Sequence, residues 1–244
     1  KKNLNKKIKL ISPNTIMFNK FGRRVKFLIS LYYLFKEIIK NKNAIVFCFQ
    51  GIFYCTFFCK LFSTKIIIRS NSSPSGWSKN LLKNYLYRIV YGWADKIIVN
   101  SLEFKEELSK KFNLDSICIY NPLNLDEITL LSRKKINISF FKKKNFNIIN
   151  VARLNEQKDQ MLLLNAIDKL KHIIPIKLLI IGSGIEKNNL LNFFQKNNLQ
   201  KIVKIIPFKQ NPFPYILKSD LFVLTSKYEG LPNILLEALS LKKI

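Results

Sequence analysis

The chain has 244 residues, of which 48% are hydrophobic, and only seven glycines and eight prolines, which excludes a disordered linker and a collagen-like repeat. Its formal net charge of +27 favours anionic partners: nucleic acid, an acidic membrane surface or phosphorylated substrates. The abundance of Lys, Asn, Ile and Phe is also what an AT-rich genome encodes, so the charge alone does not identify a function.

The cysteines and the histidine argue against a metal centre. Cys48, Cys55, Cys59 and Cys118 form no CxxC pair, and His172 is the only histidine. We therefore expect no zinc site, and buried free thiols in a reducing compartment. The first residue is Lys and no signal peptide follows, so we expect a cytoplasmic protein that is cut at this end.

The longest apolar stretch, Ala44–Cys59, contains Gln50 and Gly51. A membrane-spanning helix needs about 20 apolar residues, so this stretch is too short to be one. We interpret it as a buried strand followed by a buried helix.

Short β-type runs alternate with longer helical ones in the first half of the chain. Strands are predicted at Ala44–Phe49, Lys65–Arg69, Lys96–Asn100 and Ser116–Tyr120. Helices are predicted at Val25–Lys40, Ile52–Phe62, Trp77–Gly92 and Glu103–Phe112. Such alternation is typical of a parallel sheet with right-handed crossovers.

The same alternation restarts after Leu130–Asn145, a segment rich in Lys and Ser that we interpret as a linker. Strands are predicted at Phe146–Val151, Lys177–Ile181, Val203–Pro207 and Leu221–Thr225. Helices are predicted at Gln160–His172, Lys187–Asn197, Pro212–Lys218 and Pro232–Leu241. The chain thus predicts two doubly wound α/β domains, residues 1–140 and 141–244, neither of them complete.

Residues that could bind phosphate or sugar groups follow three strands of the second half. Arg153 and Lys158 follow the first strand, and both can pair with the phosphates of a diphosphate. The helix that begins at Pro232 offers free amides to an anion, and Glu229 and Glu237 flank its start. Because carboxyl ends of parallel strands meet at one edge of a sheet, we expect these groups at one rim.

Each of these features is weak alone. An Arg after a strand is usually solvated, and a carboxylate such as Glu237 is common on helix surfaces. The Gly182-Ser-Gly184 turn lacks the full dinucleotide-binding pattern. The order and spacing of the three features together carry the prediction.

Three runs of the second half resemble the C-terminal domain of family-4 glycosyltransferases, which are retaining GT-B enzymes. They are VARLNEQKD from Val151, LLIIGSG from Leu178, and NPFPYILKSDLFVLTSKYEGLPNILLEALSL from Asn211. The stretch EGLPNILLE, from Glu229 to Glu237, matches the family's Glu-x7-Glu motif. The resemblance implies a GT-B fold with two Rossmann-like domains that face a cleft.

The resemblance also implies a role for each donor-side residue. Arg153 and Lys158 would bind the donor diphosphate, Glu229 the donor sugar and Glu237 the ribose. Glu229 also remains a possible nucleophile. The remaining donor-binding positions are Gly182, the amides of Gly230, Leu231 and Pro232 for phosphate, and the loop Phe208–Pro212 for the base.

The first half resembles the acceptor domain of the same enzymes through IIIRSNSSP from Ile66, WADKIIVNSLEFKEEL from Trp93 and IYNPLNLDEI from Ile119. This places Gln50, Arg69 and Asn71 on the acceptor side. The family's first strand and Gly-rich loop are missing here, and so is a histidine near the acceptor. At the other end, the family continues beyond Ile244.

The implied reaction moves a sugar from a nucleoside-diphosphate sugar, for which we expect UDP, to a glycan or polyprenyl-linked acceptor with retention. No metal or other cofactor is implied, since the cations and the helix dipole stabilise the leaving diphosphate. The implied role is bacterial surface polysaccharide or glycoconjugate synthesis. Peripheral contact with an anionic membrane would use Arg23, Arg24 and Lys26, beside Phe21 and Phe27.

Three alternatives compete with this hypothesis. The charge suggests a nucleic-acid-binding protein, but the basic residues are scattered and no binding motif appears. A catalytically incomplete GT-B fragment agrees with both ends being cut. A sugar-nucleotide epimerase of the same fold would use histidines that this chain lacks.

Overall fold

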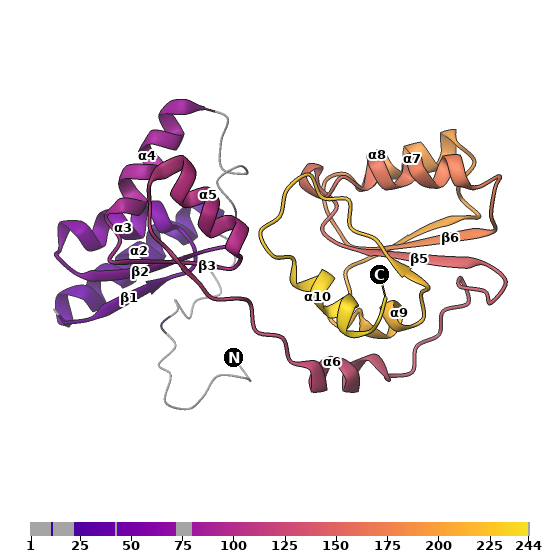
Figure 1. Ribbon diagram of the computed structural model, residues 1–244, viewed down its shortest axis with the longest axis horizontal. Coiled ribbons are helices and arrows are strands. Elements are labelled where there is room, and N and C mark those ends of the chain that lie inside the picture. Colours follow the sequence, from indigo (N-terminus) through magenta and orange to yellow (C-terminus); the bar gives the residue numbers. More distant parts are fainter. Residues whose placement is uncertain (1–10, 12–21, 42, 72–79, 244) are drawn as a thin grey trace. The chain divides into compact units, whose positions relative to one another are not determined.

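The computed structural model describes residue 11 and residues 22–41, 43–71 and 80–243. The chain divides into two compact units, Lys1–Ile119 (unit 1) and Tyr120–Ile244 (unit 2). Each unit is an α/β structure built on one four-stranded sheet whose strand pairs are all parallel (Figure 1). The predicted fold class, two parallel-sheet α/β domains, is therefore confirmed.

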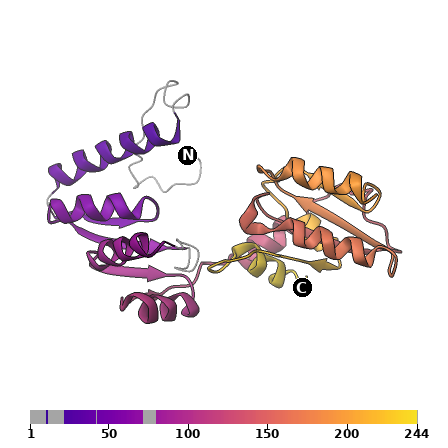
Figure 2. The ribbon, with the colours of Figure 1, turned by 90° about the horizontal axis from the view of Figure 1, so that it is seen from above.

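Unit 1 has the strand order β1-β2-β3-β4. The strands are β1 (Ile45–Cys48), β2 (Lys65–Ser70), β3 (Lys96–Val99) and β4 (Ile117–Cys118). The helices are α2 (Arg23–Lys40), α3 (Ile52–Leu61), α4 (Leu81–Gly92) and α5 (Leu102–Phe112). Figure 2 shows the helices of this unit flanking its strands.

The helix ends of unit 1 follow from local side chains. The Asn80 carboxamide oxygen accepts from the amides of Leu82 and Lys83, so α4 begins at Leu81. The expected helix began at Trp77, and residues 77–79 lie outside the described ones. Ser101 caps α5 in the same way, and Asn113 ends that helix with φ of 53°.

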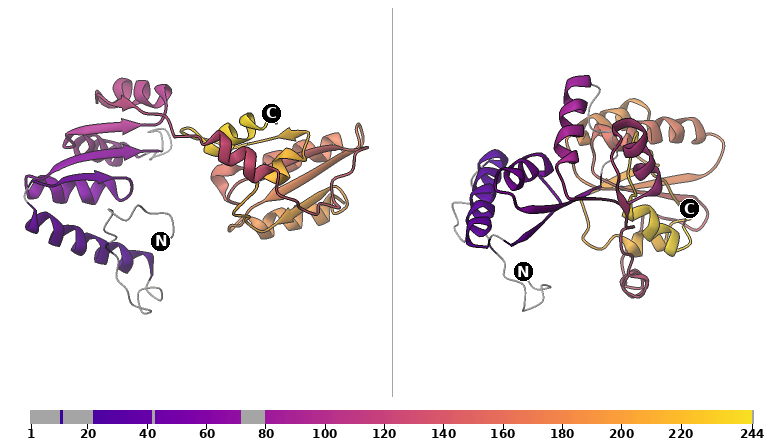
Figure 3. Two further views of the ribbon diagram at one scale, coloured as in Figure 1. Left: turned by 90° about the horizontal axis from the view of Figure 1, so that it is seen from below. Right: turned by 60° about the vertical axis from the view of Figure 1, so that its left-hand side comes forward.

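Unit 2 has the strand order β7-β6-β5-β8. The strands are β5 (Phe146–Val151), β6 (Ile176–Ile181), β7 (Val203–Ile206) and β8 (Leu221–Phe222). The helices are α6 (Leu125–Ser132), the 3-10 helix η2 (Glu156–Lys158), α7 (Gln160–Leu170), α8 (Lys187–Lys196), α9 (Phe213–Leu217) and α10 (Asn233–Ser240). The chain first runs from β5 outward to β7 and then returns to the other side of β5, so the strand order reverses at β5 (Figure 3).

Both faces of the second sheet are covered. Ile148, Leu178 and Ile180 pack under α7 and α8 on one face. Their neighbours Ile149 and Leu179 pack on the other face, in the core that α6, α9 and α10 complete (Figure 1). This burial on both faces explains why β5 and β6 are continuous apolar runs rather than alternating ones.

β8 is shorter than the predicted Leu221–Thr225 because a side chain replaces a strand partner. The Asn150 carboxamide donates to the carbonyl of Val223 at 2.8 Å, where the ladder would otherwise continue. The chain leaves the sheet there and reaches the segment before α10. The early end of β8 thus helps to shape the region that follows the strands.

The division between the units lies before Tyr120, whereas the sequence suggested one at residue 140 with a linker over Leu130–Asn145. The reason is α6, a helix that the sequence analysis did not predict. Asn124 caps it, since its side-chain oxygen accepts from the Glu127 amide at 3.1 Å, and its carboxamide nitrogen donates to the Glu127 carboxylate at 3.2 Å. Ile128 is buried in the core of unit 2, so α6 is part of that unit.

Candidate functional site

A cavity of about 590 Å³ opens in unit 2 at the carboxyl ends of β5 and β6. It lies where the strand order reverses, which is where ligands bind in open α/β sheets. The structure brings together here four residues that the sequence analysis selected from separate segments. These are Arg153, Gly182, Phe208 and Glu237.

Two glycines allow the loops after β5 and β6 to lie against each other. A Cβ atom on Gly182 would stand 1.9 Å from the carbonyl oxygen of Ala152, and one on Gly184 would stand 2.0 Å from that of Leu154. The Leu154 amide donates to the carbonyl of Ser183 at 3.0 Å, and the Glu186 amide donates to that of Leu154 at 3.1 Å. The Gly-Ser-Gly turn therefore serves close packing of two backbones, and the Gly182 amide donates to the carbonyl of Ile206 at 3.0 Å.

Arg153 is exposed, but its backbone is fixed from below. The carboxamide of Gln160, which is buried at the start of α7, donates to the Arg153 carbonyl at 3.0 Å. The sequence analysis did not select Gln160, although a polar residue at the first position of an apolar helix could have suggested such a role. This bond holds the Arg153 backbone at the cavity, while its side chain is exposed.

Glu237 reaches the cavity from α10. Burial raises the pKa of its carboxyl above the ordinary value, since the charged form loses water. The start of α10 is held by Asn121, whose carboxamide donates to the Leu231 carbonyl at 3.3 Å and to the Asn233 side chain at 2.6 Å. Asn121 belongs to the NPLN run and was not predicted to act on the donor side.

Lys158 and Glu229 form an ion pair with each other. Both side chains are mostly buried, with 13% and 22% of their surfaces exposed. The surrounding contacts fix η2 to the segment after β8, because the hydroxyl of Thr225 lies 3.1 and 2.9 Å from the carbonyls of Lys158 and Asp159.

A second pair of contacts strengthens the same connection. The Lys227 amide donates to the carbonyl of Gln157 at 2.8 Å, and the Gln157 carboxamide donates to that of Tyr228 at 3.0 Å. Lys227 also pairs with Glu156 at 3.0 Å on the surface. The segment from 225 to 229 is thus tied to η2 by backbone and side-chain bonds together.

The predicted donor residues therefore fall into two groups. Arg153 and Glu237 line the cavity, together with the predicted Gly182 and Phe208. Lys158 and Glu229 are paired with each other and do not line the cavity. Gly230, Leu231 and Pro232 join these groups along the chain, but they do not line the cavity. Pro232 stands at the N-cap of α10, with no side-chain cap on the helix.

A separate cavity of about 540 Å³ in unit 1 brings together all three predicted acceptor-side residues. Gln50 follows β1, Arg69 is the last but one residue of β2, and Asn71 follows that strand, and all three line this cavity. The Arg69 guanidinium donates to the carbonyl of Ile119 at 3.2 Å, which fixes its direction.

Tyrosine rings form much of the remaining wall of the unit 1 cavity, contributed by Tyr54, Tyr87 and Tyr91. Burial raises the pKa of Tyr91 to about 12, so its hydroxyl remains protonated and donates to Ser70 at 3.4 Å. Aromatic rings and amides in one wall are suited to the apolar faces and hydroxyls of a sugar.

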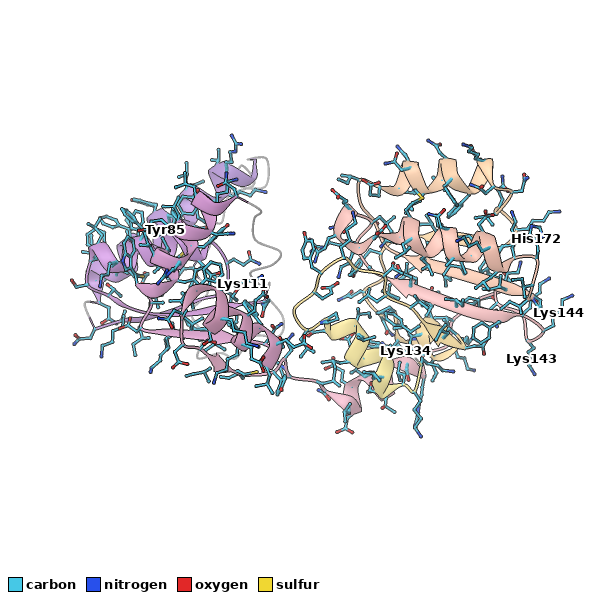
Figure 4. All side chains as sticks on the ribbon, turned by 45° about the horizontal axis from the view of Figure 1, so that its top comes forward. Tyr85, Lys111, Lys134, Lys143, Lys144 and His172 are labelled. Atoms are coloured by element: carbon cyan, nitrogen blue, oxygen red, sulfur yellow. The ribbon has the colours of Figure 1, made fainter. Side chains whose placement is uncertain are left out.

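Two further observations concern groups outside both cavities. His172 is exposed after α7, and Figure 4 shows it on the same side of unit 2 as Lys144. Among the described residues, no three His, Cys, Asp or Glu side chains are grouped to hold a metal ion. No helix within the described part of the chain is both long and apolar enough to cross a bilayer.

Comparison with known sequences gives relatives that agree with the motifs. An uncharacterized glycosyltransferase of Methanocaldococcus jannaschii is 33% identical over 190 residues, which cover 73% of this chain and 47% of that protein. The N-acetylgalactosamine-N,N'-diacetylbacillosaminyl-diphospho-undecaprenol 4-alpha-N-acetylgalactosaminyltransferase of Campylobacter jejuni is 31% identical over 185 residues, which cover 72% and 49%. The chain spans about half the length of these curated relatives.

A solved structure with a similar fold is a mutant of S. aureus TarM in complex with Fondaparinux, alpha-GlcNAc-glycerol and UDP. It matches with a TM-score of 0.67 at 20% identity, over 87% of this chain and 42% of that one. At this identity the likeness shows the fold, which is GT-B. Residues 132–244 match the family model of glycosyl transferases group 1. With the donor-side motifs and the relatives in agreement, this part of the chain belongs to the glycosyl transferases group 1 family.

Proposed function

We propose that the protein to which this chain belongs transfers a sugar from a UDP-sugar to a glycan or polyprenyl-linked acceptor, with retention of configuration. We place this activity in the synthesis of bacterial surface polysaccharides or glycoconjugates, on the cytoplasmic side of the membrane. The name of the Campylobacter relative supports the acceptor class, since it specifies a sugar chain on diphospho-undecaprenol. The UDP in the TarM complex supports the nucleotide.

The observation that carries the proposal is the cavity at the switch point of unit 2. It combines a cation, a glycine turn, an aromatic ring and a carboxylate in one wall. These are groups that a nucleoside diphosphate needs: Arg153, beside the Gly182 turn, for phosphate, Phe208 for the base, and Glu237 for ribose hydroxyls.

The Lys158–Glu229 pair supplies the two residues that we propose act on the reacting groups. We assign Lys158 to the leaving diphosphate and Glu229 to the transferred sugar, as the motif resemblance implies. In the resting protein each is paired with the other, in a place where a lone charge would be costly. A diphosphate that approaches Lys158 would free Glu229 to bind a sugar hydroxyl.

In the proposed step the bond between the anomeric carbon and the diphosphate oxygen breaks, the acceptor oxygen bonds to the same face of that carbon, and the proton of the acceptor hydroxyl passes to the leaving diphosphate oxygen. The charge that develops on the diphosphate is met by Arg153, Lys158 and the amides at the start of α10. These groups can carry the charge without a metal ion, so we propose a metal-independent reaction. The unit 1 cavity, with Gln50, Arg69 and Asn71, is the proposed acceptor site.

Titration of the chain with UDP, GDP, ADP and their sugars tests the donor site, with melting temperature as the readout. We expect UDP and UDP-sugars to raise the melting temperature, and Arg153→Ala to weaken UDP binding roughly 10- to 100-fold, because a charge-assisted hydrogen bond to phosphate is lost. The matched control is Arg133→Ala, which removes the same charge from the exposed end of α6.

Two results would count against the donor site. One is the absence of a shift with any of the nucleotides. The other is an equal loss of binding in Arg133→Ala, which would show that only the overall charge of the chain attracts the nucleotide.

A further inference from the structure

One side of α4 is apolar and exposed. Leu82 and Tyr85 expose 67% and 58% of their surfaces, and Leu86 and Trp93 are exposed as well. Their spacing places all four on one side of the helix, while Tyr91 is buried on the other. A helix in a small domain normally turns such a side inward, so this exposure needs an explanation.

The exposed apolar surface continues onto α3. The rings of Phe57 and Trp93 lie side by side with centroids 6.4 Å apart, and Leu61 is exposed one turn beyond Phe57. We call this surface the α3–α4 stripe. Its residues are Phe57, Leu61, Leu82, Tyr85, Leu86 and Trp93.

The charges on these two helices have one sign. α3 carries Lys60, and α4 carries Lys83 and Arg88, all exposed, and neither helix contains Asp or Glu. The acid that follows α4, Asp95, accepts from the Ile66 amide at 2.7 Å. Leu, Phe, Tyr and Trp side chains beside Lys and Arg are the composition of helices that lie in a membrane interface.

The positive charge of both helices also favours an anionic bilayer over a second copy of the chain as the partner of this surface. In a two-fold dimer built on this surface, the same cations of two copies would be brought close together, which is unfavourable. The headgroups of an anionic bilayer would instead pair with them, while the apolar side chains enter the acyl boundary.

We infer that the α3–α4 stripe is a docking surface for an anionic lipid bilayer. The inference rests on the proposed function, which gives the chain a reason to bind a membrane, because a polyprenyl-linked acceptor is found there. It replaces the surface expected from the sequence, Arg23, Arg24 and Lys26 beside Phe21 and Phe27. The Phe27 ring packs against Tyr54 at 5.0 Å, and Phe21 and the Arg23 side chain lie outside the described residues.

Sedimentation with sucrose-loaded vesicles tests the surface, using phosphatidylcholine vesicles with and without phosphatidylglycerol. We expect the chain to sediment with the anionic vesicles. Leu82→Ser with Tyr85→Ser should weaken this partitioning by at least about tenfold, because two apolar side chains are lost. Lys83→Gln with Arg88→Gln should weaken it about thirtyfold.

The matched control is Lys143→Gln with Lys144→Gln, which removes two charges from unit 2 (Figure 4). It should partition as the unaltered chain does, and circular dichroism should show all variants folded. An unaltered chain that ignores anionic vesicles, or stripe variants that bind as well as it does, would overturn the inference. So would a dimer in size-exclusion chromatography that Leu82→Ser with Tyr85→Ser abolishes, since a second copy would then cover the stripe.

The UDP titration of the same variants separates this inference from the proposed function. If the chain binds UDP but no vesicles, the docking surface is refuted and the donor site is supported. If the chain binds vesicles through the stripe but binds no nucleotide, the donor site is refuted and the docking surface is supported.

Discussion

The carboxyl of Glu237 shows how folding and binding place opposite demands on one residue. Its pKa is raised because α10 holds it partly buried in the cavity wall. A group whose pKa is higher in the folded state than in the unfolded state adds stability below its ordinary pKa, and that stability is lost as the pH rises through the folded value. At neutral pH the ionised Glu237 therefore costs stability, which the protein tolerates if the charge is used to bind a ligand.

Glu237→Gln should consequently be more stable than the unaltered chain at neutral pH, and the difference should shrink toward pH of about 4, near the ordinary pKa of a Glu carboxyl. The same substitution should weaken UDP binding. Urea denaturation at the two pH values measures the first effect, with exposed Glu106→Gln as control. A variant that is less stable than the unaltered chain at neutral pH would show that Glu237 is ionised and well paired in the fold.

At the scale of elements, the strands and most helices could be predicted because parallel strands covered on both faces are continuous apolar runs. β5 has the predicted bounds, and the other matched elements differ mainly at their ends. What could not be predicted depends on contacts distant in sequence. The Lys158–Glu229 pair joins positions 71 residues apart, and the bonds from Asn121 to α10 span more than a hundred.

The missed helix α6 is a different case, because its signal was present. Asn124 followed three residues later by Glu127 is a helix-start pattern. The Lys- and Ser-rich run beyond it concealed the helix by suggesting a linker. By contrast, the placement of Arg153 and Glu237 in the lining of one cavity was predictable, because the carboxyl ends of parallel strands must meet at one edge of the sheet.

The contact between the loops after β5 and β6 yields a prediction of stability. Gly182→Ala should destabilise the fold by about 3 kcal/mol, because the new Cβ would meet the backbone oxygen of Ala152, which cannot move without opening the sheet edge. Gly22→Ala is the control, since nothing lies within 4 Å of its Cβ position, and it should change stability by about 0.5 kcal/mol or less. Urea denaturation compares them, and equal stabilities would refute the close packing of the two loops.

For the whole molecule, each candidate cavity is lined by residues of a single unit. The donor and acceptor sites can thus be tested separately, even though the chain spans about half the length of its curated relatives. The sequence motifs selected residues of both cavities, whereas the α3–α4 stripe became apparent only from side-chain exposure. Periodicity alone would have assigned those apolar residues to a core.

The most direct test of the donor cavity is a crystal structure of the chain with UDP. The account predicts the diphosphate against Arg153 and the glycine turn, the uracil beside Phe208, and the ribose hydroxyls on Glu237, with Lys158 turned toward phosphate. A nucleotide bound elsewhere, with no contact to Arg153 or Glu237, would contradict it.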